Sequence, residues 1–326
     1  MITIITVIMV IFLPTISYPL KPTYGVTFSP MYARYLELDW QKTYTSMLDE
    51  LHVKLLRIPT YWSKVEAVES KYDFSEIDFI VSEAEKRGAK IVLVVGIKQP
   101  RWPEYHLPEW AKGINTEQKQ EKALKLASAL VRRYQSSPTI TAWQVENEPF
   151  VTWFGEDIDK TPINQEFLRE EISLVKKLDP SRKVIVTDTG EWSLWKNAMQ
   201  SGDILGVSIY RKAHNPKFGY ITYPFFPAMY TIKSNLARKL FAPHPPAGGQ
   251  KTIISELQAE PWLQKGVMES LVSEQARLFS VKELEGNVNF AKKTGFNEIY
   301  LWGVEWWYYM ASQGHPEYLE YAKNIF

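Results

Sequence analysis

The chain has 326 residues, of which 45% are hydrophobic and 23% are charged, as in an ordinary folded domain with a large core. The formal net charge is +1, and no run of Lys and Arg is longer than two residues, so nucleic acid is not an expected partner. Cysteine is absent, which excludes disulfides, thiolate catalysis and Cys-ligated zinc.

Residues 1–20 differ from the rest of the chain because they contain no charged side chain. The apolar run 2–13 has the length of a signal-peptide core, and Thr15 and Ser17 are small enough for a cleavage site. An uncleaved anchor is the alternative, since about 20 uncharged residues can just span a bilayer. We expect an extracytoplasmic protein, either secreted or tethered to a membrane through residues 2–20.

After Lys21, short β-branched runs recur along the chain and are typical of strands covered on both faces. These runs are 25–28, 54–58, 91–95, 141–145, 184–187, 204–209, 252–255 and 299–302. Amphipathic patterns predict helices between them at 40–51, 75–87, 116–134, 164–178 and 274–294. The stretch 243–249, which is rich in proline and glycine, is interpreted as a loop before the seventh strand.

Eight strands that alternate with helices predict a single (β/α)8 TIM barrel over residues 21–326. A doubly wound open sheet is the alternative fold, and it usually has a glycine-rich turn after its first strand. Here the first strand is followed by Ser29, Pro30, Met31 and Tyr32, without a glycine. The pattern therefore favours the barrel, and it leaves the oligomeric state open.

Polar and aromatic residues follow the predicted strands, at the end of the barrel where active sites lie. Tryptophan follows six of the eight strands, and such rings can provide flat platforms for sugars as well as core packing. Trp62 after the second strand and His106 after the third are candidate substrate-binding residues. The inserted segment 212–226, with four aromatic residues near its end, is a candidate wall of the cleft.

Two glutamates stand out by their position, Glu148 after the fourth strand and Glu256 after the seventh. Cleavage of a glycosidic bond needs a proton for the departing oxygen and a carboxylate for the anomeric carbon. Strands four and seven lie roughly opposite each other in an eight-stranded barrel, so their ends can face each other across its mouth. Glu146 and Glu260 are competing carboxylates, of which Glu146 is the less suited because it precedes Asn147 at the strand end.

The sequence Asn147-Glu148-Pro149 after one strand and Ile254-Ser255-Glu256 on another resembles the large clan of retaining (β/α)8 glycoside hydrolases. That clan includes cellulase, xylanase, β-mannanase and β-galactosidase families. The resemblance implies that Glu148 is the general acid/base and Glu256 the nucleophile. It extends from about residue 24 to the end of the chain, and it does not assign one family.

The same resemblance implies roles for four further residues. Asn147 would hold the 2-hydroxyl of the sugar, and Arg57 would pair with Glu256 and keep it ionised. Tyr210 would donate a hydrogen bond to Glu256, and Trp302 would form the floor of the cleavage subsite. Gln144 departs from the pattern, because several families of the clan have an acidic residue there.

The predicted function is that of a retaining β-glycosidase that acts on β-linked oligo- or polysaccharides. The alternative is a catalytically inactive barrel that binds glycans as a lectin or scaffold. The five histidines show no metal-ligand spacing and no Gly-x-Ser-x-Gly motif is present, so we expect neither a metal nor a cofactor.

Overall fold

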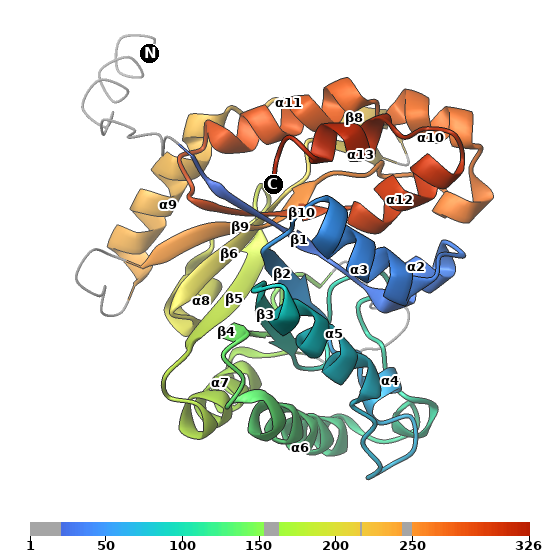
Figure 1. The fold of residues 1–326 in the computed structure, drawn as a ribbon. Helices are drawn as coiled ribbons and strands as arrows, with labels where there is room; N and C mark the ends of the chain where they lie inside the picture. The colour runs from blue at the N-terminus through green and yellow to red at the C-terminus, as the bar shows by residue number, and fades with distance from the viewer. Residues whose placement is uncertain (1–20, 153–162, 216, 243–249) are drawn as a thin grey trace, which may run out of the picture.

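The computed structural model describes residues 21–152, 163–215, 217–242 and 250–326, and its centre is a closed barrel of eight strands (Figure 1). Every neighbouring pair in the barrel is parallel. In spatial order the barrel consists of β1 (Thr23–Thr27), β10 (Glu298–Trp302), β9 (Lys251–Gln258), β6 (Ile204–Ile209), β5 (Lys183–Thr189), β4 (Ile140–Val145), β3 (Lys90–Val95) and β2 (Leu55–Ile58). This confirms the predicted (β/α)8 fold and all eight predicted strands.

The barrel strands are buried on both faces, which explains their nearly unbroken apolar sequences. In β3 every residue after Lys90 is buried. A small inner cluster fills the barrel interior with side chains from five strands, and a larger cluster joins the outer strand faces to the helices. The inner cluster consists of Val92, Ala142, Ile185, Ile253 and Tyr300.

The helices lie outside the strands and cover the barrel (Figure 1). They are α2 (Pro30–Tyr35), α3 (Trp40–Glu50), α4 (Trp62–Val65), α5 (Ser75–Lys86), α6 (Thr116–Tyr134), α7 (Gln165–Leu178), α8 (Lys196–Ser201), α9 (Pro227–Phe241), α10 (Val272–Leu278), α11 (Val281–Lys292), α12 (Val304–Ser312) and α13 (Glu317–Ala322). The short 3-10 helices η1 (Glu109–Ala111) and η2 (Val267–Glu269) lie in connections.

The predicted helices before residue 180 are confirmed, and side-chain caps fix the starts of three of them, α3, α6 and α7. Asp39 accepts hydrogen bonds from the backbone of α3, and Asn164 does so for α7. Asn115 and Gln118 form a reciprocal capping box at the start of α6.

The prediction of one helix over 274–294 is wrong, because the chain breaks between α10 and α11. Ser280 is the N-cap of α11 and forms a capping box with Glu283. This Ser-x-x-Glu pattern is a start signal inside an otherwise continuous amphipathic run, so it divides the run into two helices.

The segment 212–226, predicted as a wall of the cleft, contains a two-stranded antiparallel hairpin outside the barrel. Its strands are β7 (Lys212–Asn215) and β8 (Gly219–Thr222), and α9 follows shortly after. The hairpin comes directly after β6, at the end of the barrel that carries the candidate glutamates.

Three sequence-based predictions fall on residues that the structure does not describe. Residues 1–20 carry the predicted signal or anchor, 243–249 the predicted loop, and Trp153 is one of the aromatic residues after a strand. None of the helices among the described residues combines the length and the hydropathy that a membrane span requires.

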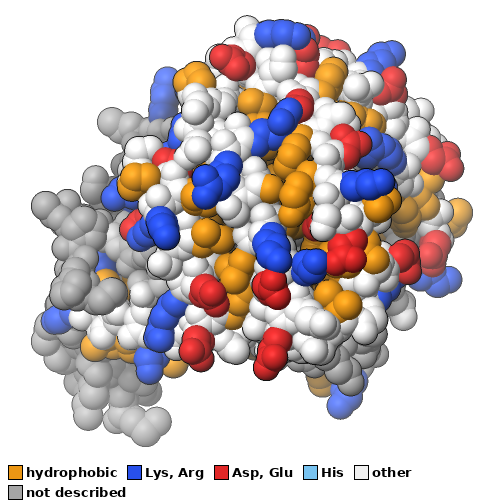
Figure 2. Space-filling model, turned by 90° about the horizontal axis from the view of Figure 1, so that it is seen from below, with side chains coloured by type: hydrophobic (Ala, Val, Ile, Leu, Met, Phe, Trp, Pro, Cys, Tyr) orange, Lys and Arg blue, Asp and Glu red, His pale blue; other side chains and the backbone are white. Residues whose placement is uncertain are grey.

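On the face shown in Figure 2, basic and acidic side chains are interspersed, and neither sign of charge gathers into a patch.

Candidate active site

The connection after β4 begins with Glu146, and the carboxylate of Glu146 ties it to the connection after β3. Glu146 and Glu148 both have positive φ angles, 59° and 43°. The Glu146 carboxylate is fully buried and accepts the backbone N–H groups of Ile97 and Lys98, at 2.8 and 2.6 Å. Glu146 is therefore a structural carboxylate that joins the β3 and β4 connections.

Gly96 allows this contact between the two connections. Its φ is 118°, and a Cβ atom placed on it would lie 2.5 Å from the carboxyl carbon of Glu146. Lys98, in the same connection, donates from Nζ to the carbonyl oxygens of Glu148 and Val151 at 3.0 and 2.8 Å. The backbone that carries Glu148 is thus fixed by the neighbouring connection.

Glu256 lies near the end of β9 and is held by two donors, one on β2 and one directly after β6. Arg57 on β2 donates from Nη1 to Oε1 at 2.8 Å, and the Tyr210 hydroxyl donates to Oε2 at 2.8 Å. Arg57 and Glu256 are 1% and 5% exposed, so water screens this ion pair little. Both contacts stabilise the ionised form of the carboxylate.

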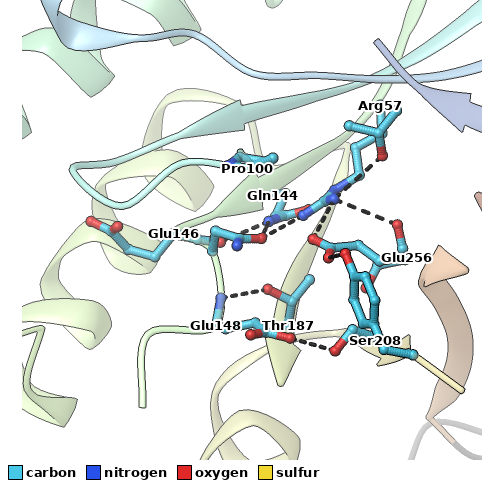
Figure 3. A network of polar contacts seen from close by, with 12 residues as sticks. Arg57, Pro100, Gln144, Glu146, Glu148, Thr187, Ser208 and Glu256 are labelled. Atoms are coloured by element: carbon cyan, nitrogen blue, oxygen red, sulfur yellow. Dashed lines mark hydrogen bonds and ion pairs between the residues drawn. The ribbon is translucent and has the colours of Figure 1, made fainter. Parts of the chain in front are cut away.

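Arg57 is the centre of a polar network that joins three strands and the connection after β4 (Figure 3). Its Nε donates to Gln144 Oε1 at 2.7 Å, and its Nη2 donates to Asn147 Oδ1 at 2.6 Å. Both of these partners are neutral amides. Glu256 is therefore the partner that neutralises the positive charge of Arg57. A carboxylate at position 144 would compete for that charge, which gives a physical reason for an amide there.

Glu148 occupies a different environment from Glu256. Its backbone N–H donates to Thr187 Oγ1 at 2.8 Å, and Ser208 Oγ donates to its carboxyl oxygen at 2.5 Å (Figure 3). Burial raises the pKa of Glu148 to about 8, with further contributions from the negative charges of Glu256 and Glu104. Its carboxyl group therefore carries a proton at neutral pH.

Glu148 and Glu256 lie close enough to interact, and both act on the same tyrosine. The charge of Glu256 raises the pKa of Glu148, and Ser208, whose hydroxyl donates to Glu148, is the register partner of Glu256 between β6 and β9. Burial raises the pKa of Tyr210, and the charges of Glu256 and, more weakly, Glu148 add to this effect. Glu256 is thus held by a cation and a hydroxyl, and Glu148 carries a proton, a pairing suited to glycosidic bond cleavage.

The remaining predicted residues lie around this pair, but not all face its centre. Trp302 ends β10 and is 9% exposed, with the guanidinium of Arg101 over its ring at 4.2 Å. His106 is 7% exposed, contacts the Tyr61 ring, and its Nε2 donates to the carbonyl oxygen of Arg101 at 3.0 Å. Burial lowers the pKa of His106 to about 4, so it is a neutral residue that positions the β3 connection.

The prediction that Trp62 binds substrate is not kept. Its side chain is fully buried at the start of α4, its Nε1 donates to Glu66 at 2.8 Å, and its ring packs edge-on against Trp110. No face of the indole is free for a sugar. A position directly after a strand predicts a ring at the barrel mouth, but the side chain of Trp62 packs into the core between the barrel and the helices.

An exposed aromatic group lies after β5 and β8, and two of its rings belong to the segment 212–226 that was predicted as a wall of the cleft. Trp192 is 60% exposed, and the rings of Tyr223 and Phe225 contact it at 5.4 and 6.3 Å. We call these three residues the Trp192 cluster. Trp192 follows β5, and Tyr223 and Phe225 follow the β7–β8 hairpin that comes after β6. The cluster therefore lies on the same side of the barrel mouth as Ser208 and Glu148.

Sequence reasoning also missed Ser208 and Glu104 as neighbours of the acid. Ser208 lies near the end of β6 with its hydroxyl on Glu148, and Glu104 lies in the β3 connection, where Lys98 pairs with it at 2.9 Å. Neither has a motif, because each matters through a contact that only the closed barrel creates. No group of His, Asp and Glu in the described residues has the arrangement of a metal site.

A closed parallel barrel with this pair of glutamates on β4 and β9 has the architecture of the (β/α)8 glycoside hydrolases. Residues 22–218, more than half of the chain, match the family described as Cellulase (glycosyl hydrolase family 5). The chain belongs to this family. Glu256 lies outside the matched segment, so its assignment rests on the contacts with Arg57 and Tyr210.

Two curated relatives and one solved structure give the range of similarity. The chain is 28% identical over 130 residues to a probable mannan endo-1,4-β-mannosidase F of Emericella nidulans, covering 37% of this chain and 28% of that one. It is 24% identical over 174 residues to the β-galactosidase BgaA of Clostridium cellulovorans, covering 48% and 26%. GH5_18 of Streptomyces cattleya, solved with GlcNAc, has a TM-score of 0.59 at 13% identity, covering 86% and 70%.

These similarities differ in what they support. The chain spans about a quarter of the length of the curated relatives that it matches. The solved structure, at 13% identity, supports the fold alone. The roles of the site residues therefore rest on the contacts within this chain.

Proposed function

We propose that this protein is a retaining β-glycosidase that hydrolyses O-glycosidic bonds of β-linked oligo- or polysaccharides. The observation that carries the proposal is the unlike environment of the two carboxyl groups. Glu256 is stabilised as an anion by Arg57 and Tyr210, and Glu148 is kept protonated by burial and neighbouring negative charge. The relatives named a β-mannosidase and a β-galactosidase support a β-linked hexose.

In the first step, Glu256 attacks the anomeric carbon while the bond from that carbon to the leaving oxygen breaks. Glu148 gives its proton to the departing oxygen, and a covalent glycosyl-enzyme forms. In the second step, water attacks the same carbon and gives a proton to Glu148, and the ester bond to Glu256 breaks. Asn147, held by Arg57, is positioned to bind the sugar 2-hydroxyl.

The product anomer tests this mechanism. If an aryl β-glycoside is hydrolysed in an NMR tube, the β-anomer should appear first and then mutarotate, because two inversions restore the configuration. Initial release of the α-anomer would contradict the proposed double displacement.

The rival function, a glycan-binding barrel without catalysis, is disfavoured by the same electrostatics. A binding protein has no need for a buried carboxyl group with a pKa of about 8, as in Glu148, beside a second carboxyl group that is paired with an arginine, as in Glu256. Binding of glycans without hydrolysis or transglycosylation by the purified protein would favour the rival.

The activity should follow a bell-shaped pH profile. Glu148 must be protonated, so activity should fall as the pH rises through about 8, the pKa of that carboxyl in the free enzyme. Activity should also fall in acid, because Glu256 must be ionised to attack. A profile of kcat/KM from pH 4 to 10 on an aryl β-glycoside measures both limbs, and a flat profile would contradict the assignment.

The Trp192 cluster is proposed to receive the leaving part of the substrate, because it lies on the side of the proton donor Glu148. Trp192→Ala should raise KM for oligosaccharides roughly five- to tenfold with little change in kcat, since stacking is lost equally in the ground and transition states. Leu194→Ala is a matched control, because Leu194 is a 75% exposed hydrophobic side chain two residues away. A fall in kcat alone would contradict this role.

Export through residues 1–20 remains a proposal that rests on their uncharged, apolar sequence. Expression of the full chain with fractionation of the host would test it. N-terminal sequencing of the recovered protein would distinguish a cleaved signal from a membrane tether.

A further inference from the structure

The connection after β3 carries a buried arginine that the proposed chemistry does not use. Arg101 is 5% exposed and has a positive φ of 85°. Its guanidinium lies between two rings, 3.8 Å from the Tyr32 centroid and 4.2 Å from the Trp302 centroid. Its Nη1 forms an ion pair with Glu260, and its Nη2 forms one with Glu305 at 2.8 Å.

These contacts, which we call the Arg101 bridge, span a large part of the barrel mouth. Arg101 follows β3, whereas its partners follow β1, end β10, or follow β9 and β10. In the barrel, β2 and β1 separate β3 from β10. The connection therefore crosses over the ends of β2 and β1 to reach the far side.

The bridge is a fixed wall because hydrogen bonds hold the connection directly before Arg101. The Tyr61 hydroxyl contacts Ser29 Oγ at 2.7 Å and donates to the carbonyl oxygen of Pro100 at 3.0 Å. The backbone N–H of Thr60 donates to Gln99 Oε1 at 3.1 Å.

The position of the bridge relative to the scissile bond follows from the roles of the two glutamates. The leaving group must lie beside the proton donor Glu148, on the side of Ser208 and the Trp192 cluster. The transferred sugar must lie over Glu256 and Trp302. Because Trp302 itself contacts Arg101, the bridge stands at the far edge of the subsite for the transferred sugar.

A sugar chain could pass the bridge only by displacing Arg101, which would leave the carboxylates of Glu260 and Glu305 buried without their cation. Breaking a buried pair in this way is strongly unfavourable. Nε of Arg101 has no hydrogen-bond partner among the described residues. This Nε is itself buried, so the guanidinium is committed to its contacts with the two carboxylates and the two rings.

We propose that the Arg101 bridge ends the substrate cleft beyond a single sugar, so that the enzyme removes one residue at a time from the non-reducing end. This inference rests on the proposed hydrolase function. It assigns the direction and unit of cleavage, and it makes Arg101 a specificity-determining residue.

The test uses the full chain with β-1,4-linked hexaoses of glucose, mannose and galactose that are labelled at the reducing end. The expected products are labelled pentaose, then tetraose, with the monosaccharide as the unlabelled product from the first time point. Labelled di- and trisaccharides together with unlabelled oligosaccharides at first turnover would overturn the inference. Absence of hydrolysis on every substrate, aryl glycosides included, would instead overturn the proposed function.

Aryl glycosides provide a second test that does not depend on long substrates. Release of the aryl group from monosaccharide glycosides should be roughly 100-fold faster than from the matching disaccharide glycosides, since the second sugar would have to break a buried ion pair. Equal rates, or a preference for the disaccharide glycosides, would overturn the inference.

Variants on the same connection separate the bridge from general damage. Arg101→Ala should reduce the preference for monosaccharide glycosides at least about tenfold, whereas Arg101→Lys, which keeps the charge, should retain most of it. Trp102→Ala is the control, because Trp102 is adjacent and 66% exposed. If Arg101→Ala does not fold, the product ladder of the unaltered chain still decides the question.

Discussion

Replacement of Glu256 by alanine is expected to lower kcat on an aryl β-glycoside by about 10⁴-fold or more, because the covalent step loses its nucleophile. The substitution also leaves the guanidinium of Arg57 buried without its anion, which costs about 3–5 kcal/mol of folding stability. Glu256→Gln keeps the shape and hydrogen-bonding capacity of the side chain, so it should lose the activity with a smaller loss of stability.

The measurement is kcat from initial rates, with circular dichroism to confirm folding of both variants. Glu274→Ala is a control for glutamate removal, since Glu274 is an exposed residue of α10. If Glu256→Gln is folded and retains activity near that of the unaltered chain, Glu256 is not the nucleophile.

Replacement of Glu148 by alanine is expected to lower kcat by about 10²–10⁴-fold, the range for loss of a general acid/base. The loss should be smaller for aryl groups that leave without a proton than for unactivated ones. Azide should restore turnover, because a small anion can attack the glycosyl-enzyme without a base. The product should be the β-glycosyl azide, since a second inversion returns the starting configuration.

The same experiment separates the two glutamates. With Glu256→Ala, azide can attack only the substrate itself, so any azide product should have the α configuration. Product configuration by NMR therefore identifies which residue is the nucleophile. An exchange of these outcomes between the two variants would reverse the proposed roles.

The fold could be predicted from the sequence because it depends on local patterns. Strands such as β3 are covered on both faces, so their sequence shows an unbroken apolar run of recognisable length. Glu148 and Glu256 were predicted as site residues for a related reason, since each lies near the carboxyl end of such a run. The capping box at Ser280 was also in the sequence, but the amphipathic pattern around it masked the break.

The parts of the site that could not be predicted depend on contacts between distant segments. Trp62 and Trp192 both follow strands, yet one is fully buried and the other is 60% exposed. Only the course of each connection decides which ring is free. Arg101 meets Glu260 and Glu305 across 159 and 204 residues of sequence, so no spacing rule indicates their pairing.

Near the carboxyl ends of the strands, the network around Arg57 fills the barrel interior with charged and amide side chains. The inner cluster, by contrast, is almost entirely apolar. The guanidinium of Arg57 connects β2 with β4 and β9, which makes the Glu256 carboxylate part of what holds these strands in register. Heating should therefore abolish turnover and the near-ultraviolet signal of the aromatic rings in a single step. Loss of catalysis while the barrel stays intact would mean that the two are separable.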